Sequence, residues 1–187
     1  ASDGLVRRLL DGAHLALVSD AGTPLLSDPG ARLVRAALDA GVAVTPVPGA
    51  SALLAALVAS GLDATRFTFL GFLARKGRER REALDEIAEL RHTAVIYEAP
   101  GRVGETLAGL AAACGGDRPA ALARELTKQF EEVRRGTLAE LAAYYASQPP
   151  RGEVVLVVGG RATPAMVDPD ALRDRARALH AAGATAR

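Results

Sequence analysis

Residues 14–61 read HLALVSDAGTPLLSDPGARLVRAALDAGVAVTPVPGASALLAALVASG, and the order of apolar runs and turns within them indicates the fold. The runs 14–19 and 42–47 are short, apolar and bounded by turn residues, so we predict a buried strand in each. Helical spacing follows each run after a loop, over residues 31–40 and 52–60. Two successive strand-loop-helix units are typical of a parallel α/β sheet, which binds ligands beyond the carboxyl ends of its strands.

The remaining sequence predicts a second, mixed α/β domain and a helical tail. A basic segment, residues 75–81, follows an apolar strand and leads into a helix that continues through Leu90. Proline favours the first turn of a helix, so Pro100 is expected to open the next one. The other expected elements are strands over 93–97, 120–123, 130–135 and 154–158 and helices over 3–10 and 138–145. We therefore predict an α/β fold with a parallel-sheet domain over 1–64, a mixed-sheet domain over 65–162 and a helical tail over 163–187.

Composition limits the classes of function. The 187 residues are 49% hydrophobic, enough for a sizeable core, and a net charge of +1 provides no overall field that would recruit a polyanion. The single cysteine, Cys114, excludes an intramolecular disulfide, and no charged-then-apolar leader opens the chain, so we expect a cytoplasmic protein. The apolar runs are too short to span a membrane. The three histidines lack metal-ligand spacing, so we expect no metal site.

Common nucleotide and hydrolase motifs are absent from the sequence. No G-x-G-x-x-G follows a strand, and no G-x-x-x-x-G-K-[ST] occurs, which disfavours NAD and ATP as ligands. The absence of G-x-S-x-G disfavours a serine hydrolase. The loop over residues 20–30 is more informative, because Asp20 and Asp28 stand among glycines and prolines that stiffen it. Their carboxylates either accept hydrogen bonds from a ligand or cap the turns themselves.

Five motifs in order resemble the series found in the tetrapyrrole methylase superfamily. They are SDAGTPLLSDPG, VPGASA, YEAP, ARELTK and PPRGEVVLVVGG, and the resemblance runs from His14 to Gly160. ARELTK and the two-aspartate loop are most similar to the branch that methylates ribose on small-subunit ribosomal RNA. The resemblance implies two α/β domains with S-adenosylmethionine in the cleft between them, 2′-O-methylation of a cytidine in 16S ribosomal RNA, and a homodimer. The cofactor-binding positions that it implies are Asp20, Gly22, Thr23, Ser51, Ala52, Tyr97, Ala123 and Gly152.

The chemistry of methyl transfer suggests which charged residues to consider. Because the reaction is an in-line displacement, the protein mainly positions the acceptor oxygen against the methyl carbon. A ribose hydroxyl is a poor nucleophile at neutral pH, so a base or a nearby cation would help. In the YEAP and ARELTK motifs the candidates are Glu98, Glu125, Lys128 and, as a further cation, Arg124. Arg124, Glu125 and Lys128 could equally form structural ion pairs that hold the cleft closed.

The basic segment is the candidate contact with RNA phosphates. Its cationic residues are Arg75, Lys76, Arg78, Arg80 and Arg81. The alternative is an ordinary solvated helix surface, since Glu79 and Glu82 dilute the charge. Only 4% of the residues are aromatic, which argues against base stacking as the main mode of RNA recognition.

The chain also departs from the family pattern. Members begin with a strand and a glycine-rich turn upstream of the first helix seen here, and they carry a C-terminal helical extension. We therefore expect a chain shortened at the N-terminus and at the C-terminus, in which cofactor binding could be weakened. The alternatives to an RNA methyltransferase are a methyltransferase for a tetrapyrrole or corrinoid precursor and a non-catalytic fragment.

Overall fold

The structure of the protein is a computed structural model that describes residues 2–162, 173–175, 177–178 and 181. The expected helical tail from Asp168, and the third segment 163–187, lie mostly outside these residues. The described chain contains one five-stranded sheet with the strand order β1-β2-β5-β3-β4. The strands are β1 (Phe67–Phe72), β2 (Thr93–Glu98), β3 (Pro119–Arg124), β4 (Glu132–Thr137) and β5 (Val154–Val158). This is the mixed α/β sheet that the sequence predicts for the second domain.

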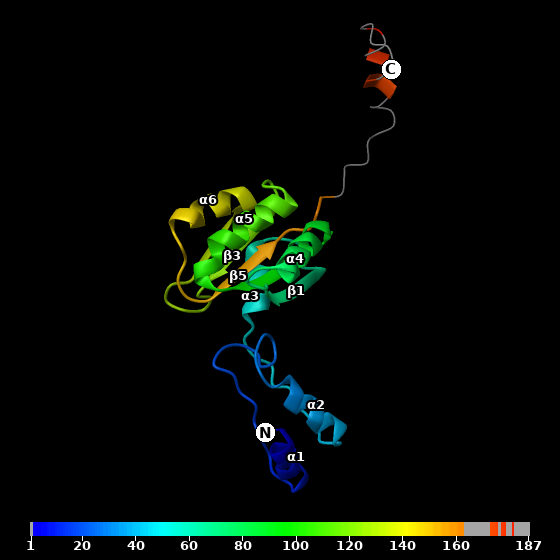
Figure 1. Ribbon diagram of the computed structural model, residues 1–187, viewed down its shortest axis with the longest axis vertical. Helices are drawn as coiled ribbons and strands as arrows, with labels where there is room; N and C mark the ends of the chain where they lie inside the picture. The colour runs from blue at the N-terminus through cyan, green and yellow to red at the C-terminus, as the bar shows by residue number, and fades with distance from the viewer. Residues whose placement is uncertain (1, 163–172, 176, 179–180, 182–187) are drawn as a thin grey trace.

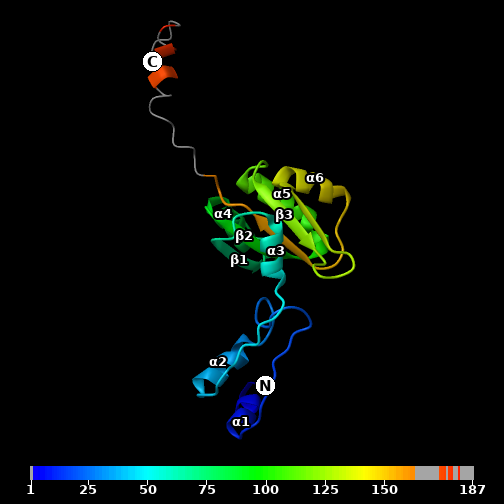
Figure 2. The same cartoon turned by 180° about the vertical axis from the view of Figure 1, so that it is seen from behind.

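Helices cover both faces of the sheet. One face carries α4 (Arg78–Glu89), α5 (Val103–Cys114) and α6 (Leu138–Ser147), and the opposite face carries α3 (Ala52–Ser60) (Figures 1 and 2). Strand side chains alternate between faces, so Ala94 and Ile96 pack in the first cluster while Val95 and Tyr97 pack beneath α3. A 3₁₀ turn, η1 (Pro100–Arg102), leads into α5 where the sequence predicts a helix opened by proline. The sheet is therefore the middle layer of three.

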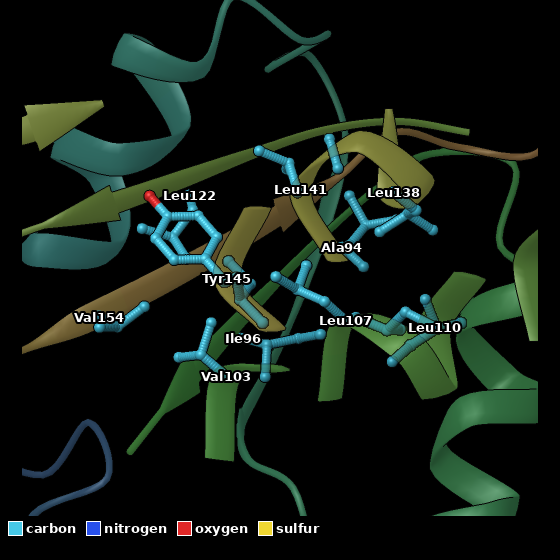
Figure 3. Packing of buried hydrophobic residues seen from close by; sticks show 14 of the residues in the cluster. Ala94, Ile96, Val103, Leu107, Leu110, Leu122, Leu138, Leu141, Tyr145 and Val154 are labelled. Atoms are coloured by element: carbon cyan, nitrogen blue, oxygen red, sulfur yellow. The ribbon is translucent and has the colours of Figure 1, made fainter. Parts of the chain in front are cut away.

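The main core lies between the sheet and the three-helix face. Leu107 and Leu110 of α5, Leu138 and Leu141 of α6, and Ile96 of β2 meet there (Figure 3). All five residues of β5, VVLVV, are buried because both faces of this central strand are covered. Full burial explains why that segment is a continuous apolar run rather than an alternating one.

Strand direction brings one end of every strand to the same edge of the sheet. β1 pairs with β2 in parallel, whereas β5 runs antiparallel to both β2 and β3, and β4 antiparallel to β3. Glu98 and Arg124 both pair with Val154, and Arg124 also pairs with Glu132. We call this the site edge: the carboxyl ends of β1, β2 and β3 with the starts of β4 and β5.

The two strands expected in residues 14–61 are not formed, and this part of the prediction is wrong. Residues 14–19 and 42–47 have no ladder partner, although the expected helices appear as α2 (Ala31–Asp39) and α3. α2 packs with α1 (Ser2–Leu10), and the pair lies beyond one end of the sheet layers (Figures 1 and 2). An apolar run becomes a strand only when neighbouring backbone satisfies its N–H and C=O groups. Neither run lies beside such a neighbour within the described residues.

Most of the helices and strands predicted after residue 64 are present in the structure. β2, β3, β5 and α6 occur within a residue or two of the predicted bounds, but β4 begins two residues later than the predicted strand 130–135. The Glu131 main chain donates to the Lys128 carbonyl, so a turn occupies the expected start. The domain boundary near residue 64 stays a prediction. α3, which precedes it, packs on the sheet through Leu53, Ala56 and Leu57.

Candidate functional site

Tyr97 is the centre of the residues that the motifs single out. It stands one residue before the end of β2, and its ring meets those of Phe69 and Phe72 edge-on at centroid distances of 4.9 and 5.7 Å. Burial raises the pKa of the Tyr97 hydroxyl, a main-chain contact with Leu53 opposes that rise, and the carboxylates of Asp28 and Glu153 add to it. The hydroxyl therefore stays protonated at neutral pH and can donate a hydrogen bond.

The two-aspartate loop reaches this end of the sheet. Thr23 Oγ1 donates to the carbonyl of Ala50 at 3.0 Å, which joins the loop to the turn before α3. Gly71 of β1 has a φ of 62°, and a Cβ there would lie 3.0 Å from Ser27 Oγ. The glycine thus lets the loop approach the strand closely. Asp28 of the same loop acts on the pKa of Tyr97, as described above. Three motifs distant in sequence, in residues 20–30, 48–51 and 97–98, therefore lie close together.

Asp20, Ser51 and Ala52 differ in how free they are to bind a ligand. Asp20 is exposed, and within the described residues its carboxylate has no partner. Ser51 is the N-cap of α3 and accepts a long hydrogen bond of 3.5 Å from the Leu54 N–H, while Ala52 is the first residue of that helix. The cap bond is weak, so the Ser51 hydroxyl and the first N–H groups of α3 remain available to a ligand.

The ARELTK motif forms a strained turn at the end of β3. Glu125 and Thr127 have φ values of 49° and 65°, a left-handed conformation that side chains rarely adopt. The Glu125 carboxylate accepts hydrogen bonds from the Glu153 N–H at 2.9 Å and from Lys128 Nζ at 3.0 Å. A Cβ on Gly152 would collide with the Glu125 side chain, and Gly152 has a φ of 81°, so only glycine fits at 152. The glycine of the PPRGE motif therefore makes room for the glutamate of ARELTK.

A cavity of about 290 Å³ opens beside this turn. Its lining comes from the ends of both motifs: Arg124, Glu125, Phe130, Arg151 and Gly152. The volume is near the lower end for small-molecule pockets, roughly 300 Å³. We call it the cofactor cavity, after the role that is proposed for it below. Ala123 lies one residue inside β3 and is 1% exposed, so its side chain offers no surface to a ligand.

Two of the candidate catalytic groups, Glu125 and Lys128, are stabilised in their charged forms by hydrogen bonds. The Glu153 main chain, and next the Lys128 ammonium, donate to the Glu125 carboxylate and lower its pKa. Hydrogen bonds to Glu125 and then Glu153 raise the pKa of Lys128, whose Nζ lies 3.1 Å from Glu153 Oε2. A base must release or take a proton near the working pH. Lys128 is protonated at neutral pH, so it can act as a cation but not as a base.

Glu98 has a structural environment rather than a catalytic one, and its candidacy is corrected here. Its side chain is 0% exposed, and its carboxylate accepts from the Ala99 N–H at 2.8 Å and from Thr106 Oγ1 at 2.5 Å. Arg102 Nε pairs with it at 3.4 Å and Arg102 Nη2 donates to the carbonyl of Leu73. We call these contacts the Glu98 network. They tie the chain after β1 to the chain after β2, and the fully buried carboxylate presents no surface to a substrate.

The basic segment divides into exposed and buried cations. Arg75, Lys76, Arg78 and Arg81 are exposed, and Arg78 pairs with Glu82. Arg80 is buried, 7% exposed, and donates to Thr106 Oγ1 at 3.1 Å and to the carbonyl of Ala74. Its prediction as an RNA contact is wrong because its guanidinium is inside the fold. Helical spacing could have identified this, since residues 80, 84 and 87 share one face of α4.

Sequence reasoning missed two charged residues at the site edge. Glu153 holds Lys128 and the main chain of Glu125, and Arg151 lines the cofactor cavity. Both lie within the PPRGE motif, so their motif membership was the available signal. In the part of the chain that the structure describes, no group of His, Cys, Asp or Glu is arranged to hold a metal ion. No helix within those residues is long and apolar enough to cross a membrane.

Comparisons with known proteins bear on the same motifs. The family model of the tetrapyrrole (corrin/porphyrin) methylases matches residues 2–142. A ribosomal RNA small subunit methyltransferase I from Synechocystis sp. is 46% identical over 97% of this chain and 66% of its own length. The protein of that name from Xylella fastidiosa is 52% identical over 86% of this chain and 60% of its own length. The chain thus spans less than two thirds of the length of these curated relatives.

Solved structures share the fold at lower sequence identity. A cobalt precorrin-4 methyltransferase of cobalamin biosynthesis superposes with a TM-score of 0.64 at 18% identity, over 84% of this chain and 69% of that one. A uroporphyrin-III C-methyltransferase from Thermus thermophilus, complexed with S-adenosyl homocysteine, has a TM-score of 0.53 at 24% identity, over 74% and 62%. At these sequence identities the similarity establishes a shared fold and does not identify a substrate. With the family model matching residues 2–142, the chain belongs to the tetrapyrrole (corrin/porphyrin) methylases.

Proposed function

We propose that the protein is an S-adenosylmethionine-dependent methyltransferase that methylates the ribose 2′-hydroxyl of a cytidine in 16S ribosomal RNA. The observation that carries the proposal is the 46–52% identity to relatives named ribosomal RNA small subunit methyltransferase I. The aligned stretch of the Synechocystis relative covers 97% of this chain and therefore includes the motifs whose residues surround the site edge. The proteins named for tetrapyrrole substrates are similar at 18–24% identity, which speaks for the fold and not for the acceptor.

The residues at the site edge fit S-adenosylmethionine. The sulfonium cation and amino acid end need carboxylate and polar main-chain partners, and Asp20 provides an unpaired carboxylate in the loop that contacts Ala50. The N–H groups in the first turn of α3, where the Ser51 cap bond is long, suit the carboxylate end. The cofactor cavity beside Gly152 can hold only part of the molecule. We propose that Gly22, Thr23, Ser51, Ala52 and Tyr97 complete the contacts, with Ala123 acting through its main chain.

The bound cofactor would supply an electrophilic methyl group for an in-line displacement. The protein's own contribution is to position the ribose oxygen and to favour its ionised form. Lys128 is the residue that we propose for the second role, because its ammonium group stays charged at neutral pH and is 45% exposed. Glu125 and Glu153 then position Lys128 rather than accept the proton. The released proton passes to solvent.

Further parts of the proposal concern the RNA and the assembly. Arg75, Lys76, Arg78 and Arg81 are exposed on the segment that follows β1 at the site edge, where they can meet phosphates beside the reacting nucleotide. We propose a homodimer in the cytoplasm, acting on small ribosomal subunits or their RNA.

A methylation assay tests the proposal. The protein is incubated with S-adenosylmethionine carrying a labelled methyl group and with small ribosomal subunits that lack the modification, and the digested RNA is mapped by mass spectrometry. We expect label on the ribose of a cytidine. Label in a tetrapyrrole or corrinoid precursor with none in the subunits would support the alternative acceptor. A folded protein that gives no heat on titration with S-adenosylhomocysteine would support the non-catalytic alternative.

A further inference from the structure

A second cavity lies beside the cofactor cavity, between β3, β4 and the end of α6. Its volume is about 230 Å³. Its polar and aromatic lining includes Arg124, Glu132, Tyr144, Tyr145, Gln148 and Arg151. We call it the tyrosine pocket. We infer that the tyrosine pocket binds a backbone phosphate of the RNA substrate next to the nucleotide that is methylated. This inference rests on the proposed function.

The hydroxyl of Tyr145 points to a ligand. Tyr145 is 3% exposed, and its buried hydroxyl oxygen makes no hydrogen bond of good geometry. Arg134 approaches the oxygen as a donor, so within the described residues the hydroxyl hydrogen itself has no acceptor. The ring packs on the aliphatic core, and the oxygen faces away from Ile96, Leu107 and Leu110 (Figure 3). A buried donor without an acceptor destabilises the fold, because it has lost its hydrogen bonds to water. A ligand oxygen in the pocket would accept this hydrogen bond and remove the penalty.

Burial also keeps that hydroxyl in its donor form. Burial raises the pKa of Tyr145 above its ordinary value, the negative charge of Glu132 adds to the rise, and Arg134 opposes it. The group therefore donates at neutral pH and suits an acceptor such as a phosphate oxygen.

The charge around the pocket favours an anion. Arg124 Nε pairs with Glu132 at 2.8 Å, and Arg134 pairs with the other oxygen of the same carboxylate at 3.2 Å. Arg134 also stacks on the ring of Tyr144, with its guanidinium carbon 3.7 Å from the centroid. Arg151 has no partner within the described residues. Two guanidinium groups thus share the one carboxylate, which leaves the guanidinium of Arg151 in the pocket lining to bind an anion. Planar guanidinium groups bind phosphate through two parallel hydrogen bonds.

The position of the tyrosine pocket favours a backbone phosphate of RNA as its ligand. Arg124 and Arg151 line both the tyrosine pocket and the cofactor cavity, so the two hollows share a wall. In RNA each backbone phosphate joins the ribose before it to the ribose after it. A phosphate held in the tyrosine pocket would therefore fix the neighbouring ribose near the cofactor cavity, which is the positioning that in-line transfer needs.

Salt-dependent binding to small-subunit ribosomal RNA tests the inference. Arg151→Gln is compared with Arg66→Gln, an exposed arginine just before β1 at the opposite edge of the sheet. We expect Arg151→Gln to lower the slope of log affinity against log salt by about 1, as for one lost phosphate contact. Arg66→Gln should leave the slope unchanged. Equal slopes for the two variants, in a protein that methylates the RNA, would overturn the inference and leave the proposed function standing.

Tyr145→Phe separates a binding role from a structural one. Removing a buried hydroxyl that donates no hydrogen bond should change the melting temperature little, because only its contact with Arg134 is lost. We expect it to weaken RNA binding severalfold all the same. Tyr145 does not line the cofactor cavity, so titration with S-adenosylhomocysteine reports whether the loss is confined to the RNA. Unchanged RNA affinity would contradict a role for this hydroxyl and with it the inference.

Inorganic phosphate distinguishes a backbone phosphate from a free anion. If wild-type protein binds phosphate and Arg151→Gln abolishes this while RNA binding is unchanged, the pocket is a free-anion site and the inference fails. Competition between phosphate and RNA that Arg151→Gln removes would support it. A wild-type protein that binds neither S-adenosylhomocysteine nor RNA would overturn the proposed function together with the inference.

Discussion

Residues 2–51 and residues 52–162 use similar sequence patterns with different results. Both stretches alternate apolar runs, turns and helices, but only the second contains a sheet. Within residues 2–51 the single buried side chain is that of Ala37, whereas Val18 and Val47 are 80% and 87% exposed. Within 52–162 two clusters fill both faces of the sheet. A pattern of apolar residues therefore specifies which face an element would bury, and burial follows only when a partner is present.

The two stretches also differ in their charged contacts. Arg35 and Asp39 form an exposed pair on α2, with side chains 78% and 58% exposed. The Glu98 network has a carboxylate at 0% exposure that meets several donors. Exposed pairs typically contribute 0–1 kcal/mol, whereas removing one member of a buried pair costs about 3–5 kcal/mol. The stability of the protein should therefore reside mainly in residues 52–162, and the following variants test this.

The largest effect is expected at Glu98. Glu98→Ala removes the acceptor for Thr106 and Ala99 and leaves Arg102 without its carboxylate, so we expect unfolding free energy to fall by about 3–5 kcal/mol. Asp39→Ala, the matched change in the exposed pair, should cost less than about 1 kcal/mol. Urea denaturation monitored by circular dichroism measures both. Similar costs for the two variants would break the comparison.

Aliphatic truncations should show the same contrast. Leu107 is 0% exposed in α5, and Leu38 is 53% exposed in α2. Leu107→Ala is expected to destabilise the protein by about 2–5 kcal/mol through lost burial and a residual cavity. Leu38→Ala should change the unfolding free energy, measured by urea denaturation, by less than about 0.5 kcal/mol, as for most surface positions. A large cost for Leu38→Ala would mean that α2 is buried in solution, for example against a second copy of the chain.

A smaller effect on stability is expected from the helix caps, one at the junction of the two stretches and one within the second stretch. Thr137 and Glu140 form a reciprocal capping box at α6, with bonds of 2.8 and 3.2 Å, whereas the Ser51 cap of α3 is 3.5 Å long. Thr137→Ala should cost about 1 kcal/mol. Ser51→Ala should cost less in thermal denaturation and weaken S-adenosylhomocysteine binding more. The reverse order in both measurements would argue against a ligand role for Ser51.

The smallest effect is expected from pH acting on the Glu125–Lys128–Glu153 cluster. The folded pKa of Glu125 lies below its ordinary value of 4.5, so its stabilising contribution is present above about that pH and is lost as pH falls through the folded pKa. The pKa of Lys128 is raised above 10.5, so its contribution is present below that pH and is lost as pH rises through the folded pKa. The melting temperatures of wild type and Glu125→Gln should therefore differ at pH 7 and converge in acid. A difference that persists at pH 2 would contradict this assignment.

Particular elements show how far the sequence reasoning could reach. The run VVLVV predicts β5 because a short, continuous run rich in β-branched valine and bounded by turn residues is typical of a strand that is buried on both faces. The run HLALVS looks similar and forms no strand, because pairing depends on a neighbour that local sequence cannot supply. The burial of Arg80 was readable from its spacing to Leu84 and Ile87 on α4. The burial of Glu98 was not, since it depends on Thr106 and Arg102 from the following helical segments.

The sequence by itself determined the family, the helices and the strands that lie inside the sheet, because motif order and apolar periodicity are properties of the chain alone. Tertiary structure decided which charged groups share an environment. Strand direction brings the ends of β1, β2 and β3 to one edge with the starts of β4 and β5, and there Arg151 joins Arg124, and Glu153 joins Lys128. The exposure of these charged side chains, their distances from partners and their pKa values all depend on that arrangement. The spacing of residues along the chain does not specify it.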